Sequence, residues 1–106
     1  MRFRRQAKLD LAAEVRYYRG EGGTAVARRV RPAIQKACRQ LESNPSIGSP
    51  SLGQELDILG LRTWLVPGFP LALWYFDRPD HVDVVRVVGV RQDAEGIELY
   101  ETRPPL

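Results

Sequence analysis

Apolar residues in the first half of the chain recur first with the period of a short strand and then with that of two helices. Residues 1–5 alternate between apolar and polar side chains, which predicts a short, half-buried edge strand. From residue 8 to about residue 18 the apolar positions fall three and four apart, as on one face of an amphipathic helix. Glycines at positions 20, 22 and 23 end that helix, and a second apolar stripe runs over residues 26–41.

The second helix carries signals at its start, in its middle and at its end. Thr24 is a suitable N-cap, because its hydroxyl can accept a backbone N–H of the first turn. Pro32 removes one intrahelical hydrogen bond and clashes one turn back, so a kink near Arg28 is expected. The Asn44-Pro45 pair ends the helix, because proline cannot continue it. The Ser-, Gly- and Pro-rich residues 46–53 predict a loop.

The second half of the chain predicts three strands. Residues 61–66 and 71–77 flank a Pro-Gly turn, and a second turn leads into residues 82–90, whose valines are apolar on both faces as in a central strand. The predicted order is β-α-α-β-β-β, an α+β fold in which a helical hairpin packs on one face of a small antiparallel sheet. Residues 1–106 are expected to form a single domain, with a mobile C-terminal tail from about residue 97.

The positive charge of the chain is consistent with two kinds of partner. The net charge is +3, and fourteen of the sixteen basic residues are arginine. Arginine makes planar, bidentate contacts with phosphate and carboxylate, so the composition fits either nucleic acid or an acidic protein. The arginines cluster at positions 2, 4 and 5 and at positions 28, 29 and 31. An acidic protein and RNA suit these clusters equally well.

Several classes of protein and site are not indicated by the sequence. No apolar run approaches the roughly 18 residues of a membrane span, and no secretory signal is found, so a cytoplasmic protein without a membrane partner is expected. Cys38 is the single cysteine and lies in a predicted helix, where an inert, buried thiol is expected. No cluster of metal-ligating residues and no nucleotide-binding glycine loop is found, so we expect neither metal nor cofactor.

Short motifs follow one another in a characteristic order over residues 1 to about 93. They are Ala7, Asp10, Leu11, Val15 and Tyr18; Leu41-x-x-Asn44-Pro45-x-x-Gly48-x-Pro50; Gly60-Leu61-Arg62; Val66 and Phe69; Trp74-Tyr75; and Arg86-Val87-Val88-x-x-Arg91-x-Asp93. In this order they resemble the ParE/RelE toxin superfamily, and in particular its ParE-like branch. The resemblance implies a toxin of a type II toxin–antitoxin system, a role in plasmid stabilisation, and neutralisation by a cognate, ParD-like antitoxin.

Two activities occur on the fold of this superfamily, and the resemblance implies different residues for each. RelE-like members cleave ribosome-bound mRNA with convergent cations and a side chain that moves protons. Here Arg62 and Arg91 match that set, Tyr100 is the nearest candidate for its aromatic member, and Trp64 stands where a second cation is needed. The set favours ParE-like inhibition of DNA gyrase by protein–protein contact, with no catalytic residues and no sequence-specific nucleic-acid binding. A RelE-like endonuclease and a non-toxic binding module of the same fold remain alternatives.

Two interaction surfaces are expected. Target-binding residues are predicted on the open face of the sheet, at Arg62, Trp64 and Arg91. Trp64 is there either an exposed interface anchor or a core residue. Antitoxin-binding residues are predicted on the helical hairpin, at Arg28, Arg29, Arg31 and Tyr17. Arg86 interrupts an apolar strand, so a structural salt bridge to a carboxylate such as Asp57 or Asp93 is expected.

Overall fold

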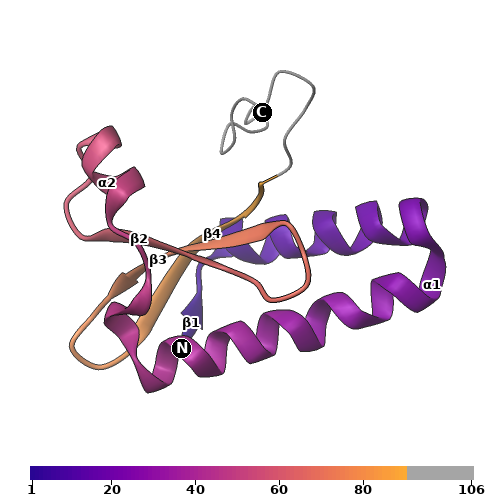
Figure 1. Ribbon diagram of the computed structural model, residues 1–106, viewed down its shortest axis with the longest axis horizontal. Helices are drawn as coiled ribbons and strands as arrows, with labels where there is room; N and C mark the ends of the chain where they lie inside the picture. Colours follow the sequence, from indigo (N-terminus) through magenta and orange to yellow (C-terminus); the bar gives the residue numbers. More distant parts are fainter. Residues whose placement is uncertain (91–106) are drawn as a thin grey trace.

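The described part of the chain is a helical hairpin, a short second helix and a four-stranded sheet (Figure 1). The structure is a computed structural model that describes residues 1–90. Its elements are β1 (Arg2–Phe3), α1 (Arg5–Ser43), a 3-10 turn η1 (Pro45–Ile47), α2 (Ser51–Leu56), β2 (Leu61–Leu65), β3 (Leu71–Asp77) and β4 (Val82–Gly89). Arg91, Asp93, Tyr100 and the tail expected from about residue 97 lie outside the described residues.

The strands lie in the order β1-β4-β3-β2. β2, β3 and β4 form antiparallel pairs, whereas β1 pairs with β4 in parallel, with Arg2 opposite Asp83 and Phe3 opposite Val84. The predicted α+β class is therefore confirmed, but the expectation of a purely antiparallel sheet is wrong. Parallel neighbours need a long connection, and here every other described element lies between β1 and β4 in the sequence. The edge strand is also shorter than the residues 1–5 that alternate.

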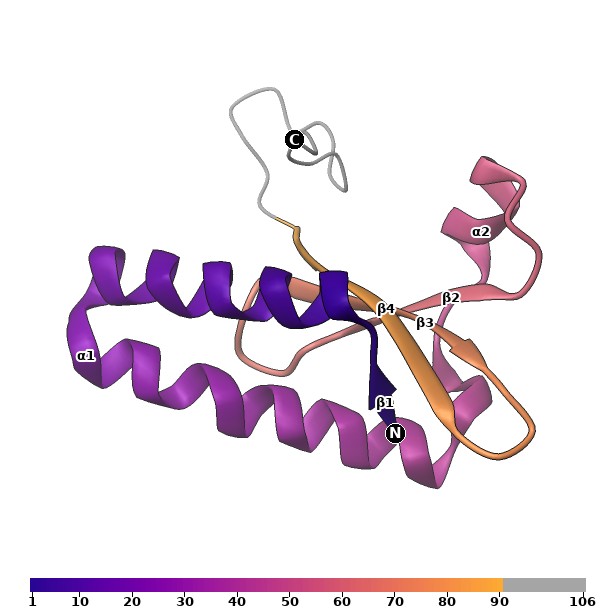
Figure 2. The same cartoon turned by 180° about the vertical axis from the view of Figure 1, so that it is seen from behind.

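Helix α1 consists of two arms that meet at Gly23 (Figure 2). Gly23 has φ 82° and ψ −177°, the one non-helical conformation inside α1, and glycine reaches such a positive φ without steric cost. We call residues 5–22 the first arm and residues 24–43 the second arm. The backbone stays helical through Pro32 and the expected kink site at Arg28, so the chain reverses at the glycine and not near the proline.

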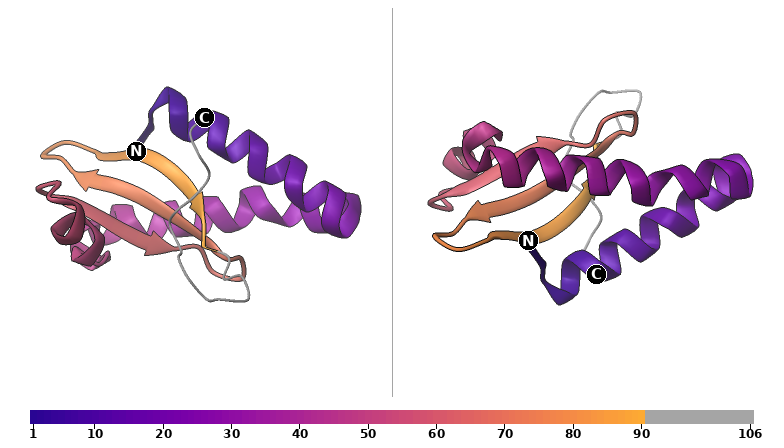
Figure 3. Two further views of the ribbon diagram at one scale, coloured as in Figure 1. Left: turned by 90° about the horizontal axis from the view of Figure 1, so that it is seen from above. Right: turned by 90° about the horizontal axis from the view of Figure 1, so that it is seen from below.

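The two arms use the sheet differently. The second arm crosses one face, whereas the first arm lies beside β4 (Figure 3). Buried side chains of the second arm and of that face form the core: Val30, Ile34, Ala37 and Leu41 with Leu71, Leu73, Tyr75, Val84 and Val87. Each fully buried aliphatic side chain contributes about 1.5–3 kcal/mol, so this contact is the main source of stability. Tyr18 of the first arm meets Phe69 of the β2–β3 turn edge to face, with centroids 5.1 Å apart.

Asp10 joins the first arm to the edge of β4 at Val87, past the residues of β4 that pair with β1. Its carboxylate accepts the backbone N–H of Val87 at 3.0 Å, and it accepts two hydrogen bonds from Arg86, at 2.7 and 3.1 Å. The expected salt bridge of Arg86 to a carboxylate is therefore confirmed, but its partner is Asp10 and not Asp57 or Asp93, because the helix that lies along the strand supplies the nearer carboxylate. The pairing with Asp10 raises the pKa of Arg86. Side-chain capping of a strand edge also leaves fewer groups free for edge-to-edge association.

Residues 46–53, expected as a loop, contain the end of η1 and the start of α2. Asp57 caps the C-terminal end of α2, and its left-handed backbone (φ 60°, ψ 38°) lets its N–H reach the carbonyls of Gly53 and Gln54. Gly53 is buried because α2 lies against β2, and a Cβ there would stand 2.5 Å from the carbonyl oxygen of Leu61. The loop prediction failed because a six-residue helix is too short to show an apolar period.

Candidate functional site

Arg62 and Trp64 point toward the second arm and its C-terminal connection. Arg62 donates through Nη1 to the backbone oxygens of Ser46, at 3.1 Å, and Gly48, at 2.6 Å. Trp64 is half-buried against the core and donates through Nε1 to Oε1 of Gln40 at 3.0 Å. The expectation that they lie on the open sheet face is therefore wrong, because the second arm packs on the face of β2 that carries them, whereas α2 lies against the same strand from the side of Leu61. Their contact with a target stays a prediction.

Tyr75 is the centre of the connection between α1 and β2. Its buried hydroxyl accepts the N–H of Gly48 at 2.9 Å and donates to the carbonyl oxygen of Pro45 at 2.6 Å. Burial raises the pKa of the Tyr75 hydroxyl, so the group keeps the proton that it donates. A Cβ at Gly48 would lie 2.5 Å from the same hydroxyl, which explains the glycine at this position. Together with Arg62, Tyr75 fixes the path of the chain into α2.

The arginines of β4 and of the β3–β4 turn are also paired. Arg78 and Arg4 both donate to Asp83, which is buried, and the shortest contact is 2.7 Å from Arg4. The hydrogen bond from Arg4, together with that from Arg78, holds the pKa of Asp83 below its usual range in spite of burial. Arg86 is held by Asp10. Among the described residues, Arg62, Arg78 and Arg86 therefore all have intramolecular acceptors and do not converge on one open site.

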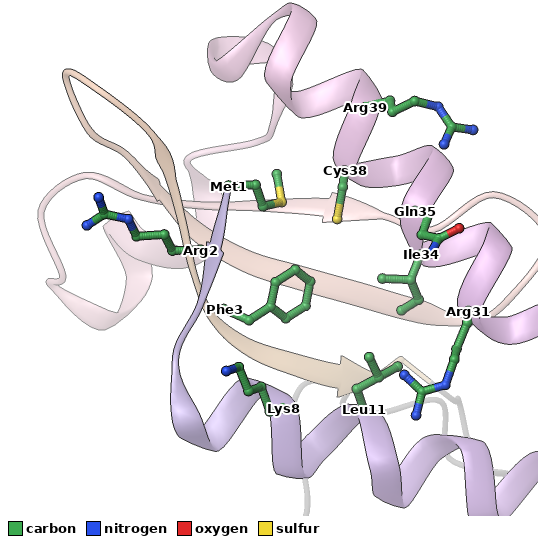
Figure 4. Close-up of a pocket in the computed structure, with 10 residues that line it drawn as sticks. All are labelled: Met1, Arg2, Phe3, Lys8, Leu11, Arg31, Ile34, Gln35, Cys38 and Arg39. Carbon is green, nitrogen blue, oxygen red and sulfur yellow. The ribbon is translucent and has the colours of Figure 1, made fainter.

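A groove with positively charged side chains opens between the two arms and β1 (Figure 4). Its volume is about 990 Å³, and Figure 4 shows the ring of Phe3 pointing into it between the arms. The residues that define this cationic groove are apolar at the floor and basic at the rim: Phe3, Leu11, Ile34 and Cys38, then Arg2, Lys8, Arg31 and Arg39. The chemistry fits an amphipathic acidic segment, with apolar side chains inward and carboxylates at the rim.

The predicted antitoxin residues divide at this groove. Arg31 lines it, whereas Arg28, Arg29 and Tyr17 are exposed outside its lining. The sequence did not indicate that Arg2 and Lys8 line one groove with Arg31, because the arms and β1 bring these residues to the same groove only in the fold. Burial raises the pKa of the Cys38 thiol to about 11, with a contribution from Glu42, so the thiol is protonated at neutral pH. An inert thiol was expected.

Two carboxylates hold parts of the fold together, and this structural role was not predicted from the sequence. Asp10 and Asp83 stand at positions where an acid interrupts an apolar pattern, one in a helix and one in a strand. A charge buried in such a pattern needs a partner, so the interruption is the signal that could have identified them. Among residues 1–90, no group of three or more His, Cys, Asp or Glu side chains is arranged to hold a metal ion. Within the same part of the chain, no helix has the length and apolar character to cross a membrane.

Comparison with known proteins relates this arrangement to one family. A search of curated proteins found no match. Among solved structures, a chain of a chromosomal ParDE toxin–antitoxin system from P. aeruginosa superposes with a TM-score of 0.70 at 22% identity, over 84% of this chain and 92% of that one. This likeness shows the fold. The family model for the ParE toxin of the type II toxin-antitoxin system parDE matches residues 1–94. The chain belongs to the ParE family of type II toxins.

Proposed function

We propose that this toxin inhibits DNA gyrase by protein–protein contact, without catalytic residues of its own. The observation that carries the proposal is the pairing of the sheet arginines. An mRNA endonuclease of this fold needs several free cations around the reacting phosphate, because they must stabilise charge that develops in the transition state. Arg62 instead donates from Nη1 to two backbone carbonyl oxygens, and Arg86 and Arg78 are paired with carboxylates. Inhibition by protein–protein contact requires no such cluster of free cations.

We also propose that a cognate, ParD-like antitoxin neutralises the toxin through an acidic segment bound along the helical hairpin. The cationic groove supports this proposal, since it combines an apolar floor with four basic side chains at the rim. Arg28, Arg29 and Tyr17 are exposed on α1 outside the lining of this groove, where they can add weaker contacts to the same segment. A segment that is disordered when free can gain both apolar burial and charge pairing in such a site.

The test is inhibition of DNA supercoiling by purified gyrase, run beside cleavage of ribosome-bound mRNA. We expect inhibition of supercoiling, intact mRNA, and recovery of supercoiling when the antitoxin is added first. Arg62→Lys is the matched variant, because it keeps the charge but loses the two-carbonyl geometry of the guanidinium. It should lower stability and leave mRNA intact.

Prompt mRNA cleavage by the wild type with gyrase unaffected would overturn the gyrase proposal. It would favour the RelE-like alternative, in which Arg62, Arg91 and Tyr100 are the candidate catalytic residues. A protein that folds, binds the antitoxin and affects neither gyrase nor mRNA would favour the non-toxic binding module.

A further inference from the structure

Exposed aliphatic side chains gather around α2, at the sheet edge opposite β1. Leu59 is 98% exposed and Leu65 is 58% exposed, and Ile47, Leu56 and Ile58 are exposed nearby. The other large apolar side chains exposed in residues 1–90, Leu9 and Tyr17, lie on the first arm. A cluster of exposed aliphatic residues on a small protein marks an interaction site, whereas single ones do not. We call Ile47, Leu56, Ile58, Leu59 and Leu65 the α2 surface.

Two hollows lie along α2, and their charge is the opposite of that of the cationic groove. One, of about 720 Å³, is lined by Ile47, Leu52, Leu65, half-buried Trp64 and the acid Glu55. The other, of about 460 Å³, is lined by Ile58 and Leu59 and contains Asp57. Neither hollow is lined by a basic residue. The α2 surface therefore fits an apolar segment that carries a basic side chain.

The outer edge of β2 adds backbone groups to the α2 surface. Thr63 exchanges two hydrogen bonds with Ser49, of 2.9 and 3.0 Å, on the side away from β3. Residues two apart on a strand direct their backbone groups to the same side, so the N–H and C=O of Leu65 also face outward. No described residue is hydrogen-bonded to them. An incoming extended segment can pair there while its side chains enter the larger hollow.

We propose that the α2 surface is the contact site for the target protein, which binds it through an apolar segment flanked by a basic residue. This inference rests on the proposed function, in which the target is met by protein–protein contact. The acidic antitoxin segment is a poor fit, because Glu55 and Asp57 would repel it. A second copy of the chain is also a poor fit, because a two-fold contact over this surface would include the acids of both copies and no basic residue from either hollow.

The test compares a double variant, Leu59→Ser/Leu65→Ser, with the control Leu9→Ser. Leu9 is 51% exposed, so all three changes remove an exposed leucine. We expect the double variant to keep its melting temperature and its antitoxin affinity, to inhibit gyrase at least tenfold less, and to lose growth arrest when expressed. Glu55→Lys should weaken gyrase inhibition severalfold by repelling the basic residue of the target. Leu9→Ser should change none of these readouts.

The readouts separate this proposal from the proposed function. Growth arrest reports target contact whatever the target is, so a wild type that arrests growth without affecting gyrase overturns only the choice of gyrase. A folded double variant that still arrests growth fully would overturn the α2 surface. A loss of antitoxin affinity in the double variant, or a wild-type dimer that the variant converts to monomer in sedimentation, would show another occupant and overturn it too. A wild type without any growth arrest would overturn both proposals.

Discussion

The cationic groove and the α2 surface lie at opposite edges of one sheet and differ in charge. The groove has arginine and lysine around an apolar floor, whereas the hollows beside α2 contain Glu55 and Asp57 and no base. A protein with net charge +3 thus presents one strongly basic site and one apolar, weakly acidic site. The difference indicates that charge determines which partner binds at which site. A partner suited to one site is repelled at the other, or its charged groups find no opposite charge there.

The two sites also differ in what fixes their shape. The groove is framed by long helical arms that reverse at Gly23 and by β1, so its walls are regular elements with internal hydrogen bonds. The α2 surface is framed by a connection that depends on Tyr75 and Arg62 for its path. A change in charge should therefore act mainly on the groove, and a change in loop packing mainly on the α2 surface.

The largest effect is expected from reversing charge at the groove. Arg31→Glu/Arg39→Glu should weaken antitoxin binding about 100-fold, about 2.7 kcal/mol, because two exposed cations at the rim of the groove become anions. Growth arrest should persist. Titration calorimetry of the antitoxin complex at two salt concentrations measures the change and its screening.

The matched control for this charge reversal is Arg28→Glu/Arg29→Glu, whose side chains are exposed outside the groove. It should weaken the antitoxin complex severalfold at most. Equal losses in both variants would place the antitoxin on the outer side of the second arm. A loss of growth arrest in the groove variant would break the separation of the two sites.

Gly48→Ala tests the support of the α2 surface. Its Cβ would stand 2.5 Å from the Tyr75 hydroxyl and 2.7 Å from the carbonyl oxygen of Thr63. The backbone of Thr63 cannot move away without a cost in free energy, because it belongs to β2. We expect a loss of about 2–3 kcal/mol in the free energy of unfolding. Urea denaturation measures it. Gly20→Ala is the control, since nothing lies within 4 Å of its Cβ and alanine should stabilise the helix by roughly 0.5–1 kcal/mol.

Tyr75→Phe should have a smaller effect on the same support. It removes one acceptor and one donor and leaves the N–H of Gly48 and the carbonyl of Pro45 without their partner. The expected loss is about 1–2 kcal/mol, with gyrase inhibition weakened more than antitoxin binding. Parallel measurement of both affinities checks this. If antitoxin binding fell as much as gyrase inhibition, the connection would support both sites and the contrast in their support would not hold.

The smallest effect on binding is expected at Asp83, because this residue belongs to neither site. Its pKa is lowered in the folded state by hydrogen bonds from Arg4 and Arg78, so it stabilises the fold at pH values above its unfolded pKa, about 3.9. That contribution is lost as pH falls through the lower, folded pKa. Asp83→Asn should therefore reduce stability at neutral pH and flatten the acid side of the stability curve. Thermal melts from pH 2 to pH 7 measure this, and neither binding affinity should change.

Much of the fold was predictable because long apolar periods specify it. The residues 26–41 stripe and the valines of β4 identify the second arm and a central strand. The parallel pairing of β1 was not predictable, since two residues carry no signal of direction or partner. The partner of Arg86 was missed for a related reason: Asp10 is 76 positions away, and only the packing of the first arm along β4 brings it near.

The sites were less predictable than the fold. The alternation in Leu-Arg-Thr-Trp-Leu correctly places Arg62 and Trp64 on one face of β2, but it does not say which face is open. That depends on which face of β2 the second arm covers and on α2, which the sequence did not reveal. Arg31 was predicted as a partner contact in a local arginine cluster. Its groove neighbours Arg2 and Lys8 come from a distant strand and from the other arm. Charge clusters in sequence thus indicate a sign, and the fold determines the site.

The pairing of β1 with β4 also determines when the N-terminal residues can fold during synthesis. Arg2 and Phe3 must wait for Asp83 and Val84 before they can join the sheet, and the N–H of Arg4 waits for the carbonyl of Val84. At about 5–20 residues per second, the ribosome needs roughly 4–16 s to make the intervening chain. Because Arg2 and Phe3 line the cationic groove, that groove does not exist on a partly made chain. The antitoxin of our proposal would therefore capture the toxin after β4 has been synthesised, and not while the chain is still emerging.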